Sequence, residues 1–238
     1  MEVVGKMYIK MSDLPKIFCL TLKDTPKRKE YAEHHFKQHR LDVTFFEGIN
    51  GEKFGLRTVI PYNDDNPNEP DLFIKQGRIG CLLSHYMLWQ TLWHLPYDEI
   101  LILEDDIVLC ENFQERFLEF KKQLPDDWQY VFVGHCCLPL EDYQIKISDN
   151  VITTTHSPMC THAYMIKKSS IPVLLETNHQ AWTAVDIQIQ KKTLKILKHY
   201  VFLPPLADQV SLLKQGQPDK LIDSENIFNS LTLDSNYL

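Results

Sequence analysis

Short apolar runs alternate with amphipathic segments at the start of the chain. Residues 14–22 (LPKIFCLTL) form a compact apolar run rich in strand formers. In residues 23–39, apolar side chains recur at helical spacing, Thr25 can cap the helix and Pro26 fits its first position. A second strand is predicted over residues 41–51, which end in a Gly/Asn turn. The β-α-β order favours a parallel sheet with helices outside it.

The middle of the chain carries the strongest patterns. Residues 52–76 are a long polar excursion that contains several prolines, and loops of this length inside a domain are usually functional or mobile. A helix with a wide apolar face is predicted over residues 77–95. Residues 99–103 (EILIL) form a buried, non-alternating strand of the kind found in parallel sheets. An amphipathic helix follows over residues 111–124, before Pro125.

The second half of the chain is less regular. Its predicted elements are, in chain order, a strand at 128–137, a hairpin of 143–147 with 151–155, a strand at 161–166, helices at 167–178 and 183–196, and an apolar segment at 197–206 that ends the regular structure. An irregular tail is predicted over residues 214–238. Since no linker or repeat divides the chain, the pattern favours one α/β domain with a mostly parallel sheet over residues 1–213.

Composition and charge narrow the class of protein. At 238 residues and 44% hydrophobic residues, the chain can bury one sizeable core or two small ones. The net charge of −7 argues against a nucleic-acid partner bound through phosphate neutralisation. The six cysteines form no CxxC pair, and adjacent Cys136 and Cys137 suit no ordinary disulfide framework. Because most of the cysteines lie in apolar runs, we predict free buried thiols in a reducing compartment. Signal-peptide and transmembrane patterns are absent, so we expect a cytoplasmic protein.

Three acidic residues directly follow the apolar strand at 99–103. Ligands of open α/β sheets bind outside the carboxyl ends of the strands, where Glu104, Asp105 and Asp106 are expected. Like charges so close together cost stability unless something neutralises them. A hard divalent cation does so, and Mg²⁺ typically takes one or two protein carboxylates together with substrate phosphates. The alternative is that Asp105 or Asp106 caps the next helix and the others are solvated.

The helix at 77–95 begins with glycines and contains a Ser-His pair. Residues 77–80 (GRIG) are too short for a dinucleotide or P-loop motif. Gly77 and Gly80 either let the helix start approach a ligand, such as an anion, or only shape a turn. No GxSxG elbow surrounds Ser84, and His85 on an apolar face is more often packed than a ligand.

Asp186 is an isolated acid in an uncharged stretch before a predicted helix. It is either a helix cap or a carboxylate with a perturbed pKa, which suits a general base. His156 and His162 either complete a metal site or are exposed loop histidines. His34 and His35 are expected at ordinary helix positions, exposed or half-buried.

These features together resemble glycosyltransferase family 25. The segments LTLKDTPKR, GRIGCLLSHYMLW, ILILEDDIVL, THAYMIKKSS and the VD before a late helix occur in the family's order, from about residue 16 to 209. The family includes lipooligosaccharide galactosyltransferases of Gram-negative bacteria. The resemblance implies a GT-A type, Rossmann-like α/β fold. It also implies a nucleotide-sugar donor, typically UDP-galactose, and an inverting transfer to a glycan acceptor. Residues 1–135 would then bind the nucleotide-sugar, and residues 136–213 would form the acceptor and catalytic half.

The resemblance also assigns roles at the donor site. The triplet from Glu104 to Asp106 corresponds to the family's variant of the DxD signature. Asp106 would contact Mn²⁺ or Mg²⁺, and Glu104 would face the donor ribose or the water shell of the metal. Asp105, between them, is assigned to donor binding, and Arg28 matches an arginine expected near the nucleotide.

Other matched positions are less specific. Gly80, Ser84 and His85 match the family's helix motif and are assigned to donor binding without a defined role. Asp186 matches the aspartate before the late helix and is predicted to be the base that takes the proton of the acceptor hydroxyl. Departures from the family pattern weaken any inference about the transferred sugar. Thr21 replaces the usual Asn, and we still assign Thr21 to the donor site. Cys160 stands where Gly is common, and Ala184 replaces a common Pro.

The sequence therefore predicts a metal-dependent, inverting transferase that moves galactose from UDP-galactose onto a lipooligosaccharide core. Because such an acceptor is lipid-linked, peripheral attachment to the inner face of a bacterial inner membrane is compatible with this interpretation. One alternative is a metal-dependent nucleotidyltransferase or phosphohydrolase that uses the same carboxylates. Another is a non-catalytic glycan-binding protein on the same fold. The oligomeric state is not predicted.

Overall fold

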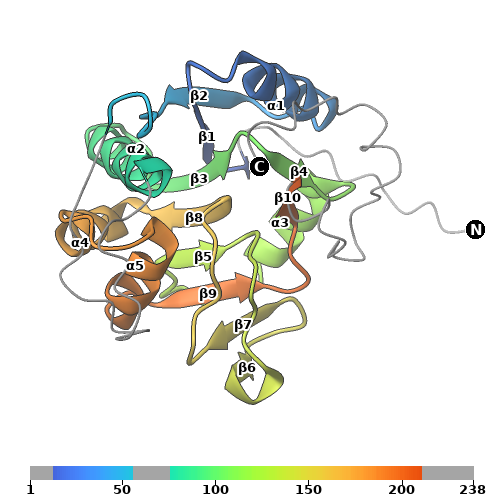
Figure 1. The fold of residues 1–238 in the computed structure, drawn as a ribbon. Helices are drawn as coiled ribbons and strands as arrows, with labels where there is room; N and C mark the ends of the chain where they lie inside the picture. Colours follow the sequence, from blue (N-terminus) through green and yellow to red (C-terminus); the bar gives the residue numbers. More distant parts are fainter. Residues whose placement is uncertain (1–12, 56–75, 211–238) are drawn as a thin grey trace, which may run out of the picture.

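One mixed sheet organises the protein, and six of its eight strands run in the same direction. The computed structural model describes residues 13–55 and 76–210, so most of the predicted 52–76 loop and the predicted 214–238 tail lie outside the described residues. The strand order is β2-β1-β3-β8-β5-β9-β7-β6 (Figure 1). The strands are β1 (Lys16–Thr21), β2 (Val43–Glu47), β3 (Glu99–Glu104), β5 (Tyr130–Phe132), β6 (Gln144–Lys146), β7 (Val151–Thr154), β8 (Ala163–Lys167) and β9 (His199–Phe202).

The direction of each strand follows from its pairing. β1 pairs parallel with β2 and β3, and β5 pairs parallel with β9. β8 runs antiparallel to both β3 and β5, and β7 runs antiparallel to β9 and β6. Only β7 and β8 therefore oppose the common direction. The predicted mostly parallel α/β sheet is confirmed, and so is the predicted hairpin, which is formed by β6 and β7.

Helices cover both faces of the sheet (Figure 1). The helices are α1 (Pro26–Gln38), α2 (Gln76–Trp93), α3 (Phe113–Lys121), α4 (Ile171–Asn178) and α5 (Val185–Lys191). Apolar residues of α1 and α3 pack in one buried cluster, and those of α2, α4 and α5 pack in a second one. β3 separates the two clusters, because Leu101 and Leu103 belong to the first, whereas Ile100 and Ile102 belong to the second. This two-sided burial explains why EILIL shows no polar alternation.

Several predicted details are wrong. Pro26 is at the start of α1, but the Thr25 hydroxyl donates to the Leu22 carbonyl, 3.1 Å away, instead of capping the helix. The predicted 183–196 helix consists of α5 and a short 3-10 turn, η4 (Thr193–Lys195). Regular structure does not end at residue 206. Two further strands, β4 (Ile107–Leu109) and β10 (Ala207–Gln209), pair with each other in a separate two-stranded sheet.

The predicted cysteine chemistry is also partly wrong. Cys136 and Cys160 form a disulfide, with their Cα atoms 5.8 Å apart. Cys19 and Cys110 are buried free thiols, as predicted, whereas free Cys137 is exposed. Because disulfides persist mainly in oxidising compartments, the cysteines no longer support the argument for a reducing one. None of the helices in the described ranges is long and apolar enough to cross a membrane.

His35 is not the ordinary surface histidine that its helical spacing indicates. Its side chain is buried, and the backbone N–H of Leu109 donates to Nε2 at 2.9 Å. The bond links α1 to β4 and requires an unprotonated Nε2. Burial, with smaller contributions from neighbouring His39 and His34, lowers the pKa of His35 to about 3.

We expect the free energy of unfolding to fall as the pH drops below the ordinary histidine pKa. Between pH values of about 6.5 and 3 the unfolded chain binds a proton at His35 that the folded chain does not bind. This difference lowers the free energy of unfolding by about 2 kcal/mol between pH 7 and pH 5. His35→Gln retains a hydrogen-bond acceptor but does not titrate. Urea denaturation at the two pH values should therefore show a smaller loss for the variant, and equal losses would contradict the prediction.

Candidate active site

The acidic triplet lies at the shared carboxyl edge of β1 and β3. In this parallel pair Leu20 is opposite Glu104, so Thr21 and the residues after β3 emerge side by side. β8 is antiparallel to β3, so the residues that precede β8 reach the same edge. The backbone N–H of Glu104 donates to the carbonyl of His162 at 2.9 Å.

Asp105 and Asp106 share one guanidinium. Arg28, from the first turn of α1, contacts Asp105 Oδ1 closely and lies 3.2 Å from Asp106 Oδ2. The Thr21 hydroxyl donates to the other oxygen of Asp105 at 2.9 Å. The Asp105 side chain is 5% exposed and that of Asp106 is 21% exposed, so both carboxylates are largely removed from water.

Neither aspartate caps a helix. The chain continues from Asp106 into β4, and Asn112 is the residue at the N-cap position of α3. The capping alternative for Asp105 and Asp106 is therefore wrong. Burial raises the pKa of both carboxyls, against the opposing effect of Arg28. The pair of acids is thus under-neutralised, and additional positive charge would stabilise it.

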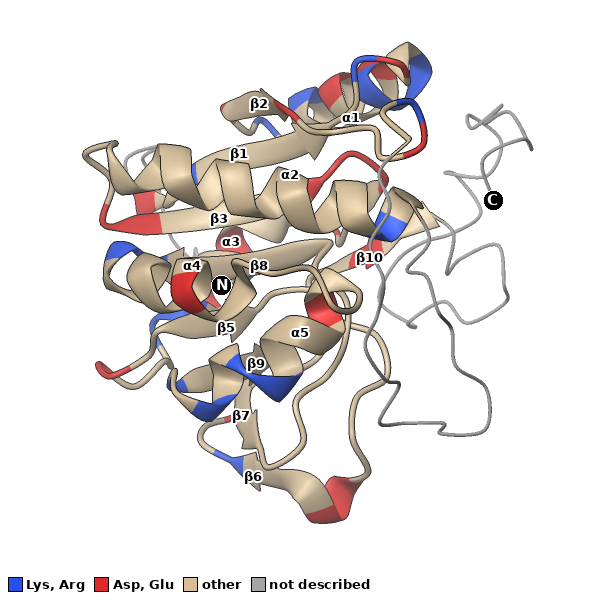
Figure 2. Ribbon diagram, turned by 60° about the vertical axis from the view of Figure 1, so that its left-hand side comes forward, with Lys and Arg blue, Asp and Glu red and all other residues tan. Residues whose placement is uncertain are grey.

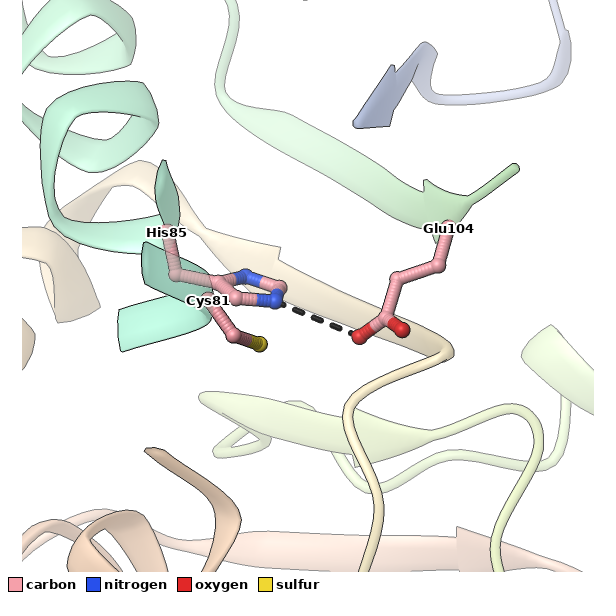
Figure 3. A group of neighbouring side chains, drawn as sticks. All are labelled: Cys81, His85 and Glu104. Atoms are coloured by element: carbon pink, nitrogen blue, oxygen red, sulfur yellow. Dashed lines mark hydrogen bonds and ion pairs between the residues drawn. The ribbon is translucent and has the colours of Figure 1, made fainter. Parts of the chain in front are cut away.

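Glu104 is held in a hydrogen-bonded network, of which Figure 3 shows the contact with His85. Its Oε1 accepts from the Thr161 hydroxyl at 2.8 Å and lies 3.3 Å from His85 Nε2. His85 Nδ1 lies 2.9 Å from the Tyr164 hydroxyl, and Trp89 Nε1–H donates to that same hydroxyl at 2.9 Å. With a neutral His85, the Tyr164 hydroxyl donates to Nδ1 and the Nε2–H donates to Glu104. Burial alone would raise the pKa of Glu104, but His85 and Thr161 lower it.

Gly80 and Ser84 join α2 to the loop after β2. The Ser84 hydroxyl donates to the Gly80 carbonyl at 2.7 Å and accepts from the Ile49 N–H at 2.8 Å. A Cβ on Gly80 would lie 2.6 Å from the Ile49 oxygen and from the Gly51 nitrogen. The close approach at Gly80 is thus between two backbones of the protein. Gly77, in contrast, has nothing within 4 Å of a Cβ.

These two glycines make a matched pair for mutagenesis. We expect Gly80→Ala to lower the free energy of unfolding by about 1–3 kcal/mol, because the added methyl forces α2 away from the 48–51 loop. Gly77→Ala, in the same helix, should be neutral or stabilising by up to about 1 kcal/mol, because alanine favours helix. Thermal or chemical denaturation of both variants checks the difference. Equal losses would show that α2 can adjust at Gly80.

Two clefts meet at Glu104 and Cys81. The first has a volume of about 250 Å³ and lies between the ends of β1 and β3, the 48–51 loop and α2. Thr21, Arg28, Ser84, His85, Glu104 and Asp105 line it, together with Asn50 and Cys81. The second, of about 160 Å³, is lined by Glu104 and Cys81 again and by Asp186, Thr161 and Gln209. The predicted donor residues therefore converge on the first cleft, except for Gly80, which supports its wall, and Asp106.

The family of the chain follows from comparison with known sequences. The family model described as glycosyltransferase family 25 (LPS biosynthesis protein) matches residues 14–189. The chain belongs to glycosyltransferase family 25. The mostly parallel sheet and its flanking helices agree with the α/β fold class that the resemblance to this family implied.

Relatives of this family 25 chain come from animals and bacteria. A "Glycosyltransferase 25 family member" of Aedes aegypti is 26% identical over 67% of this chain and 28% of its own length. "Procollagen galactosyltransferase 2" of Homo sapiens is 23% identical over 74% of this chain and 30% of its own length. "Lipooligosaccharide biosynthesis protein lic2B" of Haemophilus influenzae is 29% identical over 47% of this chain and 38% of its own length. The chain therefore spans well under half the length of these relatives.

Asp186 of the family 25 chain lies in the second cleft. It is in the first turn of α5, whereas Ala184 occupies the N-cap position, so the capping alternative is wrong here too. Its Oδ1 accepts from the Ile187 N–H at 2.8 Å and its Oδ2 accepts from the Cys160 N–H at 3.3 Å. Figure 2 shows an acidic first turn of α5 and a basic C-terminal end. Each carboxylate oxygen retains a lone pair for a ligand in the cleft.

The backbone conformation of Cys160 explains why glycine is common at this position in the family pattern. Its φ is +77°, in the left-handed region that favours glycine. The disulfide to Cys136 secures the Cys160 segment, which brings its N–H to Asp186.

The sequence did not identify several residues of the site. Gln209 Nε2 lies 3.4 Å from Asp106 Oδ1, but it comes from β10, where regular structure was predicted to have ended. Thr161 and Tyr164 belong to the THAYMI segment of the family pattern but were assigned no role. His162 is buried, not exposed, and its Nε2 lies 3.4 Å from the Ala207 carbonyl. His156 is exposed and packs against Tyr143, so these two histidines do not form a metal site together.

Proposed function

We propose that this chain is a divalent-metal-dependent, inverting glycosyltransferase. It would transfer galactose from UDP-galactose to a lipooligosaccharide core. The observation that carries the proposal is the acidic triplet at the ligand edge of the sheet, whose Glu104 lines both clefts, one of which contains Asp186. Galactose as the sugar is supported by the name of the human relative, and the lipooligosaccharide acceptor by that of the Haemophilus relative.

The donor set of the triplet fits a hard divalent ion. Asp106 and Glu104 offer carboxylate oxygens, the ligands that Mg²⁺ and Mn²⁺ prefer. Burial raises the pKa of Asp106, so a cation bound beside it would favour its charged form. These two residues would hold the ion. When bound, the ion would supply positive charge for the diphosphate leaving group. Arg28 adds a fixed positive charge beside the same carboxylates.

The two clefts suggest how the chain divides its tasks. The first cleft, with Thr21, Arg28 and the backbone of the 48–51 loop, would bind the nucleotide part of the donor. Asp186 in the second cleft would take the proton of the acceptor hydroxyl as that oxygen attacks the anomeric carbon. Attack from the side opposite the diphosphate inverts the anomeric centre. Asp186 is pre-oriented for this role, since the amides of Ile187 and Cys160 fix both of its oxygens.

A transfer assay tests this proposal. Each UDP-sugar is incubated with the protein, Mn²⁺ and a truncated lipooligosaccharide core, and mass spectrometry detects the product. We expect a hexose to be added from UDP-galactose, a loss of product with a chelator, and its recovery with Mn²⁺. A procollagen peptide is the comparison acceptor, and transfer to it alone would reject the proposed acceptor. Consumption of UDP-galactose without any acceptor would favour a phosphohydrolase. Acceptor binding without any reaction would favour a glycan-binding protein.

A further inference from the structure

Cys81, His85 and Glu104 form a cluster whose chemistry differs from that of Asp105 and Asp106. One ligand atom of each lies within 4.8 Å of those of the other two. Figure 3 shows the Cys81 sulfur and the His85 ring side by side on α2, with the Glu104 carboxylate opposite them. The cluster therefore offers one sulfur, one nitrogen and one oxygen to the same point.

The fold places these three ligands together for local reasons. Cys81 and His85 are four residues apart in α2, so their side chains lie on the same face of the helix, one turn apart. Glu104 ends β3 and is held toward them by the Thr161 hydroxyl. Tetrahedral zinc bonds of about 2.0–2.3 Å place ligand atoms about 3.3–3.6 Å apart. Only Cys81 would have to move, by a small distance, for the three ligand atoms to reach this spacing.

His85 already has the hydrogen bonding of a metal-binding histidine. Such residues usually direct one ring nitrogen to the metal and hold the other in a hydrogen bond that fixes the ring. His85 Nδ1 lies 2.9 Å from the Tyr164 hydroxyl, whose position is fixed in turn by Trp89 Nε1 at 2.9 Å. Nε2 is the nitrogen that faces Glu104 and Cys81. With an ion bound, Nδ1–H would donate to Tyr164 and the Nε2 lone pair would point at the metal.

The surroundings favour a cation and leave room for a fourth ligand. Asp105, Asp106 and Asp186 are close enough to Glu104 or Cys81 to act on them electrostatically, whereas Arg28 is already paired with two of these acids. Cys81 and Glu104 line both clefts, so the cluster is reachable from either side. Three protein ligands with an open fourth position are the arrangement of a catalytic-type zinc site.

We propose that Cys81, His85 and Glu104 bind one Zn²⁺ ion, separately from the hard divalent ion expected at Asp106. Thiolate and imidazole ligands select a softer ion than carboxylates alone do. Because Glu104 belongs to both ligand sets, zinc bound here would remove Glu104 from the Mn²⁺ or Mg²⁺ site. This consequence rests on the proposed function: zinc should inhibit the Mn²⁺-supported transfer. The binding itself does not depend on that function.

Cobalt substitution tests the binding without any sugar or nucleotide. The full-length chain, stripped with a chelator and desalted, is titrated with Co²⁺ and then with Zn²⁺. We expect one equivalent of Co²⁺ to give a thiolate-to-cobalt charge-transfer band in the near ultraviolet with intense visible bands, and Zn²⁺ to abolish them. Absence of the charge-transfer band in the wild-type chain would overturn the proposal, even if Co²⁺ binds weakly to carboxylates.

Matched variants assign the ligands. Cys81→Ser should lose the charge-transfer band, whereas Cys137→Ser, which removes the exposed thiol outside the cluster, should retain it. Tyr164→Phe, which removes the partner of Nδ1, should weaken metal binding by about 10–100-fold and still show the band. Asp106→Asn should retain the band although it is expected to impair transfer, which separates failure of this proposal from failure of the proposed function. A band that persists in Cys81→Ser would overturn the assignment, and circular dichroism checks that each variant is folded.

Discussion

Asp186→Asn should lower the transfer rate of the chain by about 10²–10⁴-fold, the range in which general bases contribute. The amide keeps an oxygen that accepts from the Cys160 or Ile187 N–H, so the fold of the α5 turn should survive. It cannot take the proton of the acceptor hydroxyl. The loss should therefore appear in kcat, with little change in the KM for the nucleotide-sugar, and steady-state kinetics with UDP-galactose separate the two.

Asp149→Asn is the control for this variant. Asp149 is also an aspartate in the second half of the chain, but its side chain is 90% exposed and its only ionic partner in the described parts is Lys146. The control should retain wild-type kinetics. If Asp186→Asn retains more than about a tenth of the wild-type rate, which is outside the general-base range, the acceptor proton is removed by another group.

Arg28→Met should lower the free energy of unfolding by about 3 kcal/mol, at the lower end of the cost of breaking a buried ion pair. The lower end applies because the Arg28 side chain is 32% exposed. The substitution preserves much of the aliphatic volume but leaves Asp105 and Asp106 without their shared guanidinium. The loss should shrink as the pH falls, because protonated carboxyls need no counter-charge. Chemical denaturation at several pH values measures both effects.

Two further variants test the origin of this loss. Lys29→Met removes the neighbouring cation, which is 46% exposed and pairs with Glu33 on the surface, and should cost less than about 1 kcal/mol. Arg28→Met combined with Asp105→Asn removes one of the stranded charges and should recover part of the stability. If the single Arg28 variant is as stable as Lys29→Met, the guanidinium does not offset the negative charge of Asp105 and Asp106.

The long apolar patterns predicted most of the fold correctly. β1 and β3 are continuous apolar runs because both of their faces are buried, and α2 has a wide apolar face, so all three stand out in the sequence. β4 and β10 are three residues each and were missed, because a three-residue strand has no period to detect. The antiparallel direction of β8 was also not predicted. Strand direction depends on the path of the connecting segments, and a local pattern does not encode that path.

The candidate site was predicted unevenly for the same reason. The acidic triplet and Asp186 stand out as charges beside apolar runs, so the sequence identified them. Gln209, Thr161 and Tyr164 became visible only when β10 and β8 placed them against Asp106, Glu104 and His85. The Cys136–Cys160 disulfide joins residues 24 positions apart, and spacing alone favoured neither partner. Long-range contacts of this kind are a property of the folded chain.

The antiparallel direction of β8 has a consequence for how acceptor preference can diverge. The segment from Cys160 to His162 reaches the ligand edge only because β8 begins there, beside the end of β3. The first cleft, which we propose binds the donor, is in contrast lined by residues before position 106. Exchange of the 156–162 and 180–186 segments between homologues would therefore alter the acceptor side while the donor strands keep their register. The family could thus acquire new acceptors by segment exchange, without rebuilding the part that binds the nucleotide-sugar.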